Sequence, residues 1–331
     1  MKIAHTLDEL NSFSTEPSVL TIGNFDGVHC GHRMVIDHAI ESASIRKAKA
    51  YAVTFDPHPA HVLHDGHRLA LITPLQEKLK LLESTGLDGV IVLPFREIRS
   101  FSAQNFAQQI LANALHAVEI HEGETFRFGH NAEADIHTLE QLGQNMGFTV
   151  HTYDPVYRRG APISSSRIRT LISLGKLAEA RALLGRPFGI HSTPASGRGY
   201  GTLYTVPTIN LAPYVELVPA NGVYITTLRV GTGPDSKLFR GVTNAGNRPT
   251  FGADSYAVET HLLDFQPIAL TEDTPLELTF LYRLRGEQRF PSPEALKTQI
   301  GRDVRHTQRY FALTDALGVP SSQPTASMPV A

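Results

Sequence analysis

Hydrophobic and polar positions follow two different patterns along the chain. Up to residue 186, short apolar runs typical of buried strands alternate with segments whose apolar residues recur at helical spacing. We expect strands at residues 19–22, 50–55, 89–93, 118–121 and 148–153, and helices at residues 33–45, 74–83, 103–115 and 136–146. Strands that alternate with helices are typical of a parallel sheet covered on both faces. We therefore predict an α/β domain over residues 1–186.

The pattern changes after Pro187. Short alternating strands separated by Asn, Gly and Pro turns are expected at residues 202–211, 222–230, 239–244, 257–265 and 276–284. This pattern indicates a small antiparallel β-barrel, followed by one helix at residues 293–311. The second domain is expected to span residues 187–313. Residues 314–331 are rich in Ser, Pro, Ala and Thr, and we predict that they are disordered.

The turn after the strand at residues 19–22 carries the most informative motif, TIGNFDGVHCGH. Its glycines, Gly23 and Gly31 among them, let the backbone approach a ligand closely, and the following helix offers N–H groups and a positive dipole end to an anion. His29 and His32 add side-chain donors that can stabilise charge developing on a phosphate. Ligands of parallel sheets bind at the carboxyl ends of strands. The motif therefore predicts a nucleotide-phosphate site.

Composition limits the classes of protein. A length of 331 residues suggests two domains, and 30 basic against 32 acidic residues leave no overall charge that favours nucleic acid or an anionic membrane. The single cysteine, Cys30, forms no internal disulfide, and the start of the chain lacks the pattern of a signal peptide. No apolar run reaches the roughly 18 residues needed to cross a bilayer. We expect a cytoplasmic protein with neither nucleic-acid nor membrane partners.

The motif GNFDGVHCGH resembles the signature of the bacterial FAD synthetase branch of the HxGH nucleotidyltransferases. The resemblance implies a Rossmann-like parallel sheet and the transfer of AMP from ATP to FMN. It places His29 and His32 at the ATP phosphates, as catalytic residues. It also implies nucleotide-binding positions at Gly23, Asn24, Phe25, Asp26 and Gly31, with Asn24 and Asp26 near the metal.

Three later segments extend this resemblance. Residues 54–59 resemble the flavin-side loop of the family, which implies a substrate-binding role for His58, and Phe126 and Phe128 resemble its aromatic segment near the flavin. Residues 163–169 resemble its second transferase motif. Serine hydroxyls can cap a helix, and guanidinium groups at a helix start suit a triphosphate. The phosphate ligands expected here are Ser165, Arg167 and Arg169.

The second domain resembles the riboflavin kinase module, in its Gly-rich residues 196–201 and its Val-Pro-Thr-Ile-Asn run. The resemblance implies that Thr208 and Asn210 bind magnesium, which prefers hard oxygen ligands. It implies that Glu259 is the catalytic base that accepts the proton of the terminal ribityl hydroxyl. Nearby, His261 falls on the same strand face as Glu259 and is a candidate to orient it. Further substrate- and nucleotide-binding positions are expected at Gly199, Gly201, Asn244 and Arg248.

The resemblance spans roughly residues 15–312, and the chain is thus identified as a member of the bifunctional riboflavin kinase/FAD synthetase family. The expected reactions are phosphorylation of riboflavin to FMN and adenylylation of FMN to FAD, both with Mg²⁺ and ATP. FMN and FAD are expected as substrate and product, not as prosthetic groups. Whether the protein forms a transient homo-oligomer is left open by the sequence.

Two alternatives remain. One is a riboflavin kinase with an inactive transferase domain, suggested by Thr125, Ala132 and Ala134, which depart from the family's usual residues. The other is a non-catalytic regulator that binds flavin or nucleotide. A metal site at His61, His64 and His67 is weaker still, because no known zinc-site spacing accompanies these residues.

Overall fold

The computed structural model describes residues 1–11, 13, 15–63, 68–195, 203–204, 208–247 and 256–318. The chain divides into two compact units, Met1–Ser165 and Ser166–Ala331, which are described separately. This division falls earlier than the boundary expected at residue 187. Helices α8 (Ser165–Ser173) and α9 (Leu177–Leu184) lie between the two positions, and α9 contacts strands β11 (Phe188–Ser192) and β18 (Leu276–Gly286). The domain boundary near residue 187 therefore stays a prediction.

The first unit is built on a six-stranded sheet in the order β1-β4-β3-β2-β5-β8. Its strands are β1 (Lys2–Ala4), β2 (Ser18–Ile22), β3 (Lys49–Asp56), β4 (Gly89–Pro94), β5 (Ala117–Gly123) and β8 (Thr149–Tyr153). Every neighbouring pair is parallel. The predicted α/β fold is confirmed, with β1 as an additional edge strand.

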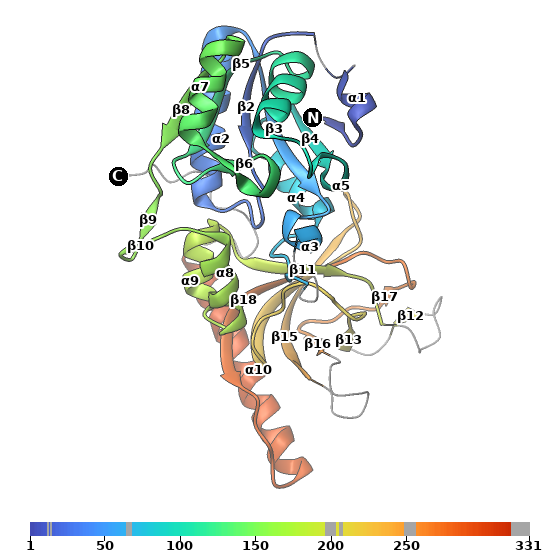
Figure 1. The fold of residues 1–331 in the computed structure, drawn as a ribbon. Helices are drawn as coiled ribbons and strands as arrows, with labels where there is room; N and C mark the ends of the chain where they lie inside the picture. The colour runs from blue at the N-terminus through green and yellow to red at the C-terminus, as the bar shows by residue number, and fades with distance from the viewer. Residues whose placement is uncertain are drawn as a thin grey trace. The chain divides into compact units, whose positions relative to one another are not determined.

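Helices cover both faces of this sheet (Figure 1). Tyr51 and Val53 of β3 face the apolar cluster that includes η1 and α7, whereas Ala50 and Ala52 face the cluster that includes α2 and α4. The alternation follows from the two-residue period of a strand. The helices of the unit are α1 (Leu7–Asn11), α2 (Cys30–Arg46), α3 (Pro59–Leu63), α4 (Leu75–Glu83), α5 (Phe95–Ile98), α6 (Ala103–Asn105), the π-helix η1 (Phe106–Ala114), the 3-10 helix η2 (His130–Ala132) and α7 (Ile136–Met146).

Short strands complete the first unit: β6 (Arg127–Phe128) pairs with β7 (Ala134–Asp135), and β9 (Tyr157–Arg158) pairs with β10 (Ala161–Pro162). The helix expected at residues 103–115 is present, but most of it is π-helical. Within the described ranges, no helix combines the length and apolarity that crossing a bilayer requires.

The second unit contains an antiparallel sheet in the order β11-β18-β14-β15-β16-β13. Its remaining strands are β13 (Thr208–Asn210), β14 (Gly222–Val230), β15 (Lys237–Asn247) and β16 (Tyr256–Leu262), and β12 (Leu203–Tyr204) pairs separately with β17 (Ile268–Ala269). The segments after the two edge strands meet, because Ala195 N–H donates to Asn210 O and Ala212 N–H donates to Thr193 O, both at 2.8 Å. The sheet therefore curls into a half-barrel, which confirms the predicted architecture.

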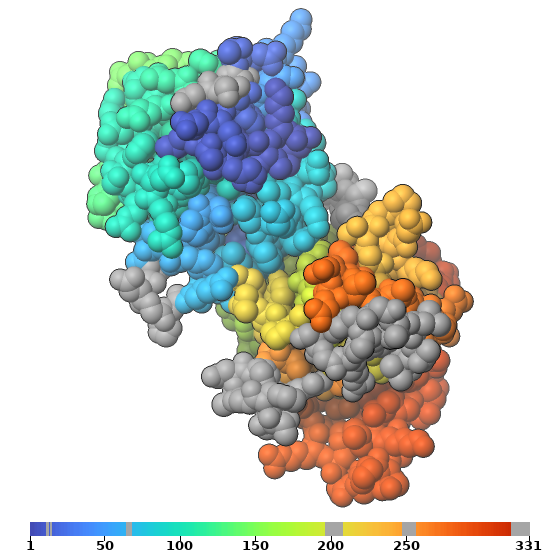
Figure 2. Space-filling view, turned by 90° about the vertical axis from the view of Figure 1, so that its right-hand side faces the viewer, coloured from blue at the N-terminus to red at the C-terminus, as the bar shows by residue number. Residues whose placement is uncertain are grey.

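The C-terminal helix α10 (Pro293–Ala316) packs on the half-barrel through buried Phe311 and lies at the surface in orange-red (Figures 1 and 2). It extends beyond Thr314, where disorder was predicted to begin, so that prediction is wrong for the last turn. The Thr314 hydroxyl donates to Phe311 O at 3.0 Å, and Asp315 Oδ1 lies 2.6 Å from Arg240 Nη2. Residues 319–331 lie outside the described residues.

A buried ion pair joins α10 to β18. Asp303 is 3% exposed, and its Oδ2 accepts from Arg285 Nε at 3.1 Å and Nη2 at 2.9 Å. Gln299 Nε2 donates to its Oδ1 at 2.9 Å. Removing one partner of a buried pair leaves an uncompensated charge, which is far more costly than losing an exposed pair.

We predict that Asp303→Ala lowers the free energy of unfolding of the second unit by about 3 kcal/mol, because Arg285 is then left without its carboxylate. The matched control is Asp315→Ala on the same helix, whose exposed pair with Arg240 is worth about 0–1 kcal/mol. Urea unfolding followed by circular dichroism compares the two variants. Equal losses would contradict the assigned role of burial.

Candidate functional site

The two motif histidines lie together at the start of α2. His29 is the N-cap residue, and its Nδ1 accepts a hydrogen bond from His32 N–H at 3.2 Å. Because Nδ1 is the acceptor, the neutral His29 ring carries its proton on Nε2. The imidazoles stack with their centroids 3.6 Å apart and an interplanar angle of 12°. The sequence thus folds into a pair of ring donors beside a helix N-terminus, which is an anion-binding arrangement.

Close packing explains two of the motif glycines. A Cβ atom on Gly31 would lie 3.2 Å from the His29 ring, and one on Gly23 would lie 3.3 Å from the Phe25 ring. Phe25 in turn contacts His32 edge-on, with ring centroids 5.2 Å apart. Glycine at position 31 therefore leaves room for the His29 ring, and glycine at position 23 leaves room for Phe25, which packs against His32.

Asp26 ties three chain segments together. Its buried carboxylate accepts hydrogen bonds from Ile72 N–H at 2.9 Å and Thr73 N–H at 3.0 Å, and Gly27 N–H donates to Thr73 Oγ1 at 2.9 Å. The hydroxyl of Ser165, at the start of α8, donates to Asp26 O at 2.8 Å. The structure thus brings Ser165, predicted as a phosphate ligand, to the motif loop.

A small cavity adjoins this loop, at the carboxyl ends of β2 and β3. Three predicted residues, Asn24, Asp26 and His58, line it. Its other lining residues are Phe55, Asp56, Leu71, Thr73, Leu75 and Lys78. The Nδ1 atom of His58 accepts from Ala60 N–H at 3.1 Å, which fixes the ring at the cavity wall. The loop after β3 therefore lies beside the motif loop, and its role towards the flavin stays a prediction.

Lys78 is a site residue that sequence reasoning missed. Its side chain is buried, and its ammonium donates to Asn24 O at 3.1 Å and to Thr54 Oγ1 at 3.0 Å. Burial lowers the pKa of Lys78 to about 8, although the nearby Asp26 and Asp56 carboxylates partly oppose the shift. The lysine carries a positive charge at neutral pH that is lost on moderate alkalinisation.

Glu122, at the end of β5, is a second buried titratable group near the motif. Its carboxyl accepts a hydrogen bond from Ile22 N–H, at the end of β2. Burial raises the pKa of Glu122 to about 8, so this carboxyl is neutral at pH 7. It therefore adds no negative charge beside the predicted phosphate site.

The aromatic segment behaves as part of the core. Phe126 and Phe128 stack with centroids 5.5 Å apart, and Phe128 is buried against Phe106 at 6.1 Å. Their contact with a flavin stays a prediction. Of the departures noted above, Ala132 has a left-handed φ of 55°, and Ala134 pairs with Phe128 in the β6–β7 ladder.

The remaining predictions for this domain fall elsewhere. Arg167 and Arg169 lie on α8 and belong to the second unit. His61 Nε2 lies 2.7 Å from Leu69 O, whereas His64 and His67 lie outside the described residues. The proposed histidine metal site is therefore not tested.

In the second unit, strand register brings the predicted kinase residues onto one face. Glu259 on β16 is directly opposite Asn210 on β13 and opposite Asn244 on β15. Directly opposite residues in an antiparallel sheet project from the same face with Cβ atoms about 5 Å apart. Glu259 therefore lies between two amide side chains, in the middle of a three-strand row.

A second row lies beside the first. His261, two residues after Glu259, is opposite Thr208, and its Nδ1 lies 3.4 Å from the threonine Oγ1. The alternate residues of β16, Val258 and Thr260, are buried in the interior. Glu259 and His261 thus share the partly exposed face, as predicted. Gly199, Gly201 and Arg248 lie outside the described residues.

The fold and the site define a two-domain transferase that uses nucleotides. A family model described as FAD synthetase matches residues 12–167, and one described as riboflavin kinase matches residues 184–311. The chain belongs to the bifunctional riboflavin kinase/FMN adenylyltransferase family.

Curated relatives span nearly the whole chain. The Escherichia coli K12 bifunctional riboflavin kinase/FMN adenylyltransferase is 34% identical over 316 residues, which cover 95% of this chain and 99% of the relative. The protein of the same name from Pseudomonas fluorescens is 35% identical over 306 residues, 92% of this chain and 94% of the relative. Both domains of the chain are therefore matched in single bifunctional proteins, which favours two activities over a kinase with an inactive partner domain.

A solved structure shares the fold. The crystal structure titled macrolide-efflux protein from Streptococcus pneumoniae aligns with a TM-score of 0.80 at 25% identity, and the alignment covers 92% of this chain and 98% of that one. The likeness supports the fold of both units.

We predict that kcat/KM for FMN adenylylation falls as the pH rises through about 8, because Lys78 loses the positive charge that attracts a phosphate-bearing substrate to the cavity. Lys78→Gln should reduce the reaction most below pH 8, where the lysine is charged, and should remove the decline above pH 8. Pyrophosphate release measured from pH 6.5 to 9.5 tests this, with riboflavin phosphorylation by the same sample as the internal reference.

The matched control for this prediction is Lys80→Gln, two residues further along α4, where the exposed Lys80 pairs with Glu77 at 3.1 Å. It should leave the pH profile unchanged. A transferase rate independent of pH up to 9.5 would refute the role of the Lys78 ammonium.

Proposed function

We propose that the second unit phosphorylates riboflavin with Glu259 as the catalytic base. The observation that carries this proposal is the register that sets Glu259 between Asn210 and Asn244. The carboxylate accepts the proton of the terminal ribityl hydroxyl while that oxygen bonds to the γ-phosphorus of ATP and ADP leaves. His261, on the same face, acts as a positioning residue for this row.

Magnesium fits the donor set beside Glu259. The Thr208 hydroxyl and the Asn210 amide oxygen are hard ligands on one short strand, and magnesium is held in proteins by such oxygens together with substrate phosphates. When bound, Mg²⁺ supplies charge neutralisation at the phosphates. Thr208 and Asn210 would hold it, while Asn244, across the sheet, orients the substrate.

In the first unit, we propose that His29 and His32 stabilise the charge that develops during AMP transfer. An FMN phosphate oxygen bonds to the α-phosphorus of ATP, and the bond to pyrophosphate breaks. The stacked imidazoles and the first N–H groups of α2 act as donors to the transferring phosphate. Neither ring acts as a nucleophile.

The remaining motif residues bind the substrates. Asn24, His58 and Lys78 line the cavity that we assign to the flavin-bearing substrate, and Asp26 fixes the loop. The hydroxyl of Ser165 and the side chains of Arg167 and Arg169 bind ATP phosphates, and Gly199, Gly201 and Arg248 bind nucleotide or substrate in the second unit.

The direct test is a time course of the purified chain with riboflavin, ATP and Mg²⁺, with the flavins separated by chromatography. FMN that appears first and FAD that follows would support both assignments. FMN that accumulates without conversion, even when FMN is supplied, would refute the transferase assignment.

We predict that Glu259→Gln lowers kcat for riboflavin phosphorylation by a factor of roughly 10²–10⁴, because the amide cannot accept the hydroxyl proton. FAD formation from supplied FMN should be unchanged, since that reaction belongs to the first unit. Both rates are measured on the same preparation. Equal loss of the two activities would contradict the division of labour.

We predict the reverse pattern for His29→Asn and His32→Gln, singly or combined. Asparagine is a good N-cap residue, so His29→Asn keeps an acceptor for the first turn of α2 but removes the imidazole. FAD formation should fall by roughly 10²–10³ for each donor removed, with FMN formation retained. Undiminished FAD synthesis in the double variant would rule out the proposed role.

A further inference from the structure

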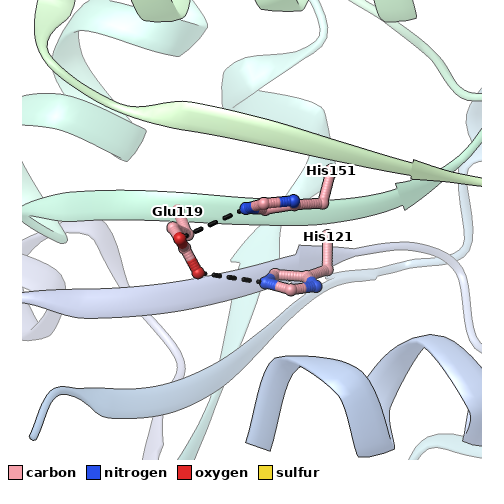
Figure 3. Close-up of side chains that lie close together, drawn as sticks. All are labelled: Glu119, His121 and His151. Atoms are coloured by element: carbon pink, nitrogen blue, oxygen red, sulfur yellow. Dashed lines mark hydrogen bonds and ion pairs between the residues drawn. The ribbon is translucent and has the colours of Figure 1, made fainter. Parts of the chain in front are cut away.

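A cluster of ligand-type side chains lies apart from both sites, on the face of the first sheet that α2 covers. Glu119 and His121 come from β5, and His151 comes from β8, where the parallel register places it beside His121. Figure 3 shows both imidazoles directed toward the Glu119 carboxylate. The Nε2 atom of His121 lies 3.4 Å from Oε2, and Nε2 of His151 lies 3.2 Å from Oε1.

These three polar side chains lie on a sheet face whose neighbouring strands are apolar. The neighbouring strands present Val19, Ala50 and Ala52 to the same helix-covered face. The side chains of Glu119 and His121 are only 3% and 4% exposed, whereas that of His151 is 43% exposed. Burying a carboxylate and an imidazole costs free energy unless each finds a partner. The His151 side chain lies at the edge of the cluster, but its Nε2 atom is buried and faces Glu119.

A further set of contacts orients His121. Its Nδ1 lies 2.7 Å from the Tyr153 hydroxyl, and the His38 ring stacks on Tyr153 with centroids 4.6 Å apart. The bond at Nδ1 turns Nε2 toward Glu119. Imidazoles that bind metals are commonly fixed in this way, through a hydrogen bond at the nitrogen that does not bind the ion.

We propose that Glu119, His121 and His151 form a binding site for a divalent transition-metal ion of the zinc class. One ligand atom from each residue lies within 4.8 Å of the other two, a spread that small side-chain movements close around one ion. Two nitrogens and one carboxylate oxygen suit tetrahedral Zn²⁺ with a fourth position for water. Magnesium, which prefers oxygen ligands, is disfavoured by the imidazoles. The ion fastens the edge strand β8 to β5.

The side chain of Arg46 competes with a metal ion for the Glu119 carboxylate. From the last turn of α2, its guanidinium pairs with Glu119 Oε1, and Ser42 on the same helix donates to Oε2. The Arg46 side chain is 49% exposed, so it can turn into solvent when an ion takes its place. Removing this charge should therefore tighten metal binding.

The test uses the full chain without an affinity tag, freed of metal by a chelator and titrated with Zn²⁺ in a calorimeter, with excess Mg²⁺ present. We expect one tight zinc per chain, at least tenfold weaker binding in His121→Gln and in His151→Gln, and tighter binding in Arg46→Gln. X-ray absorption of the zinc form should give nearest nitrogen and oxygen neighbours at about 2.0–2.2 Å.

The matched control is His137→Gln on α7, an exposed histidine paired with Glu140 at 3.3 Å, which should bind zinc like the wild type. Zinc should also raise the melting temperature of the wild type and of this control, but not of His151→Gln. Because His151 is on the exposed side, its variant keeps the test valid should His121→Gln fail to fold. Absence of tight zinc binding, or zinc binding unchanged in His151→Gln, would overturn the proposal.

Discussion

The transferase motif depends on the buried carboxylate of Asp26. The loop between β2 and α2 contains left-handed residues at Phe25 and Val28, and its conformation is held by partners distant in the sequence. Hydrogen bonds to a charged group contribute about 1.5–3 kcal/mol each, so the two backbone N–H donors from residues 72 and 73 can offset the strain of the loop. These hydrogen bonds hold the loop that leads into the first turn of α2, where both histidines lie. Anchoring by Asp26 is therefore a separate task from the phosphate binding that we propose for the histidines.

The kinase face obeys a different constraint, the register of three antiparallel strands. A shift of one residue in β16 would turn Glu259 into the interior and bring Thr260 to the surface. The interior prevents such a shift, because the hydroxyls of Thr226, Thr243 and Thr260 form a buried hydrogen-bonded row with oxygen separations of 2.7 and 2.9 Å. Interior threonines thus determine which side chains of β16 lie on its partly exposed face.

These two constraints explain how much of the molecule the sequence could predict. Strand alternation identified β14 at its observed bounds and the α/β order of the first unit, because burial period is a local property. The local sequence pattern did not predict features that depend on contacts between distant segments. Lys78 follows the charged Glu77 on an amphipathic helix and resembles a solvated lysine, yet its side chain is buried and its ammonium donates to Asn24 O. The last turn of α10 contains Asp315, which pairs with Arg240 on β15. Composition could not reveal this partner.

The cluster of Glu119, His121 and His151 under α2 likewise depends on contacts between distant segments, which set the pKa values of its members. Burial opposes ionisation of Glu119, but hydrogen bonds from Ser42, Arg46 and two imidazoles outweigh it and lower the pKa of this carboxyl to about 2. Burial lowers the pKa of His121, which keeps that ring neutral. On the neighbouring strands, Val19, Ala50 and Ala52 face α2 as part of an apolar cluster. Strands β5 and β8 instead carry a polar network whose desolvation cost is offset by its own hydrogen bonds, and the proposed ion would take the place of Arg46 in that network.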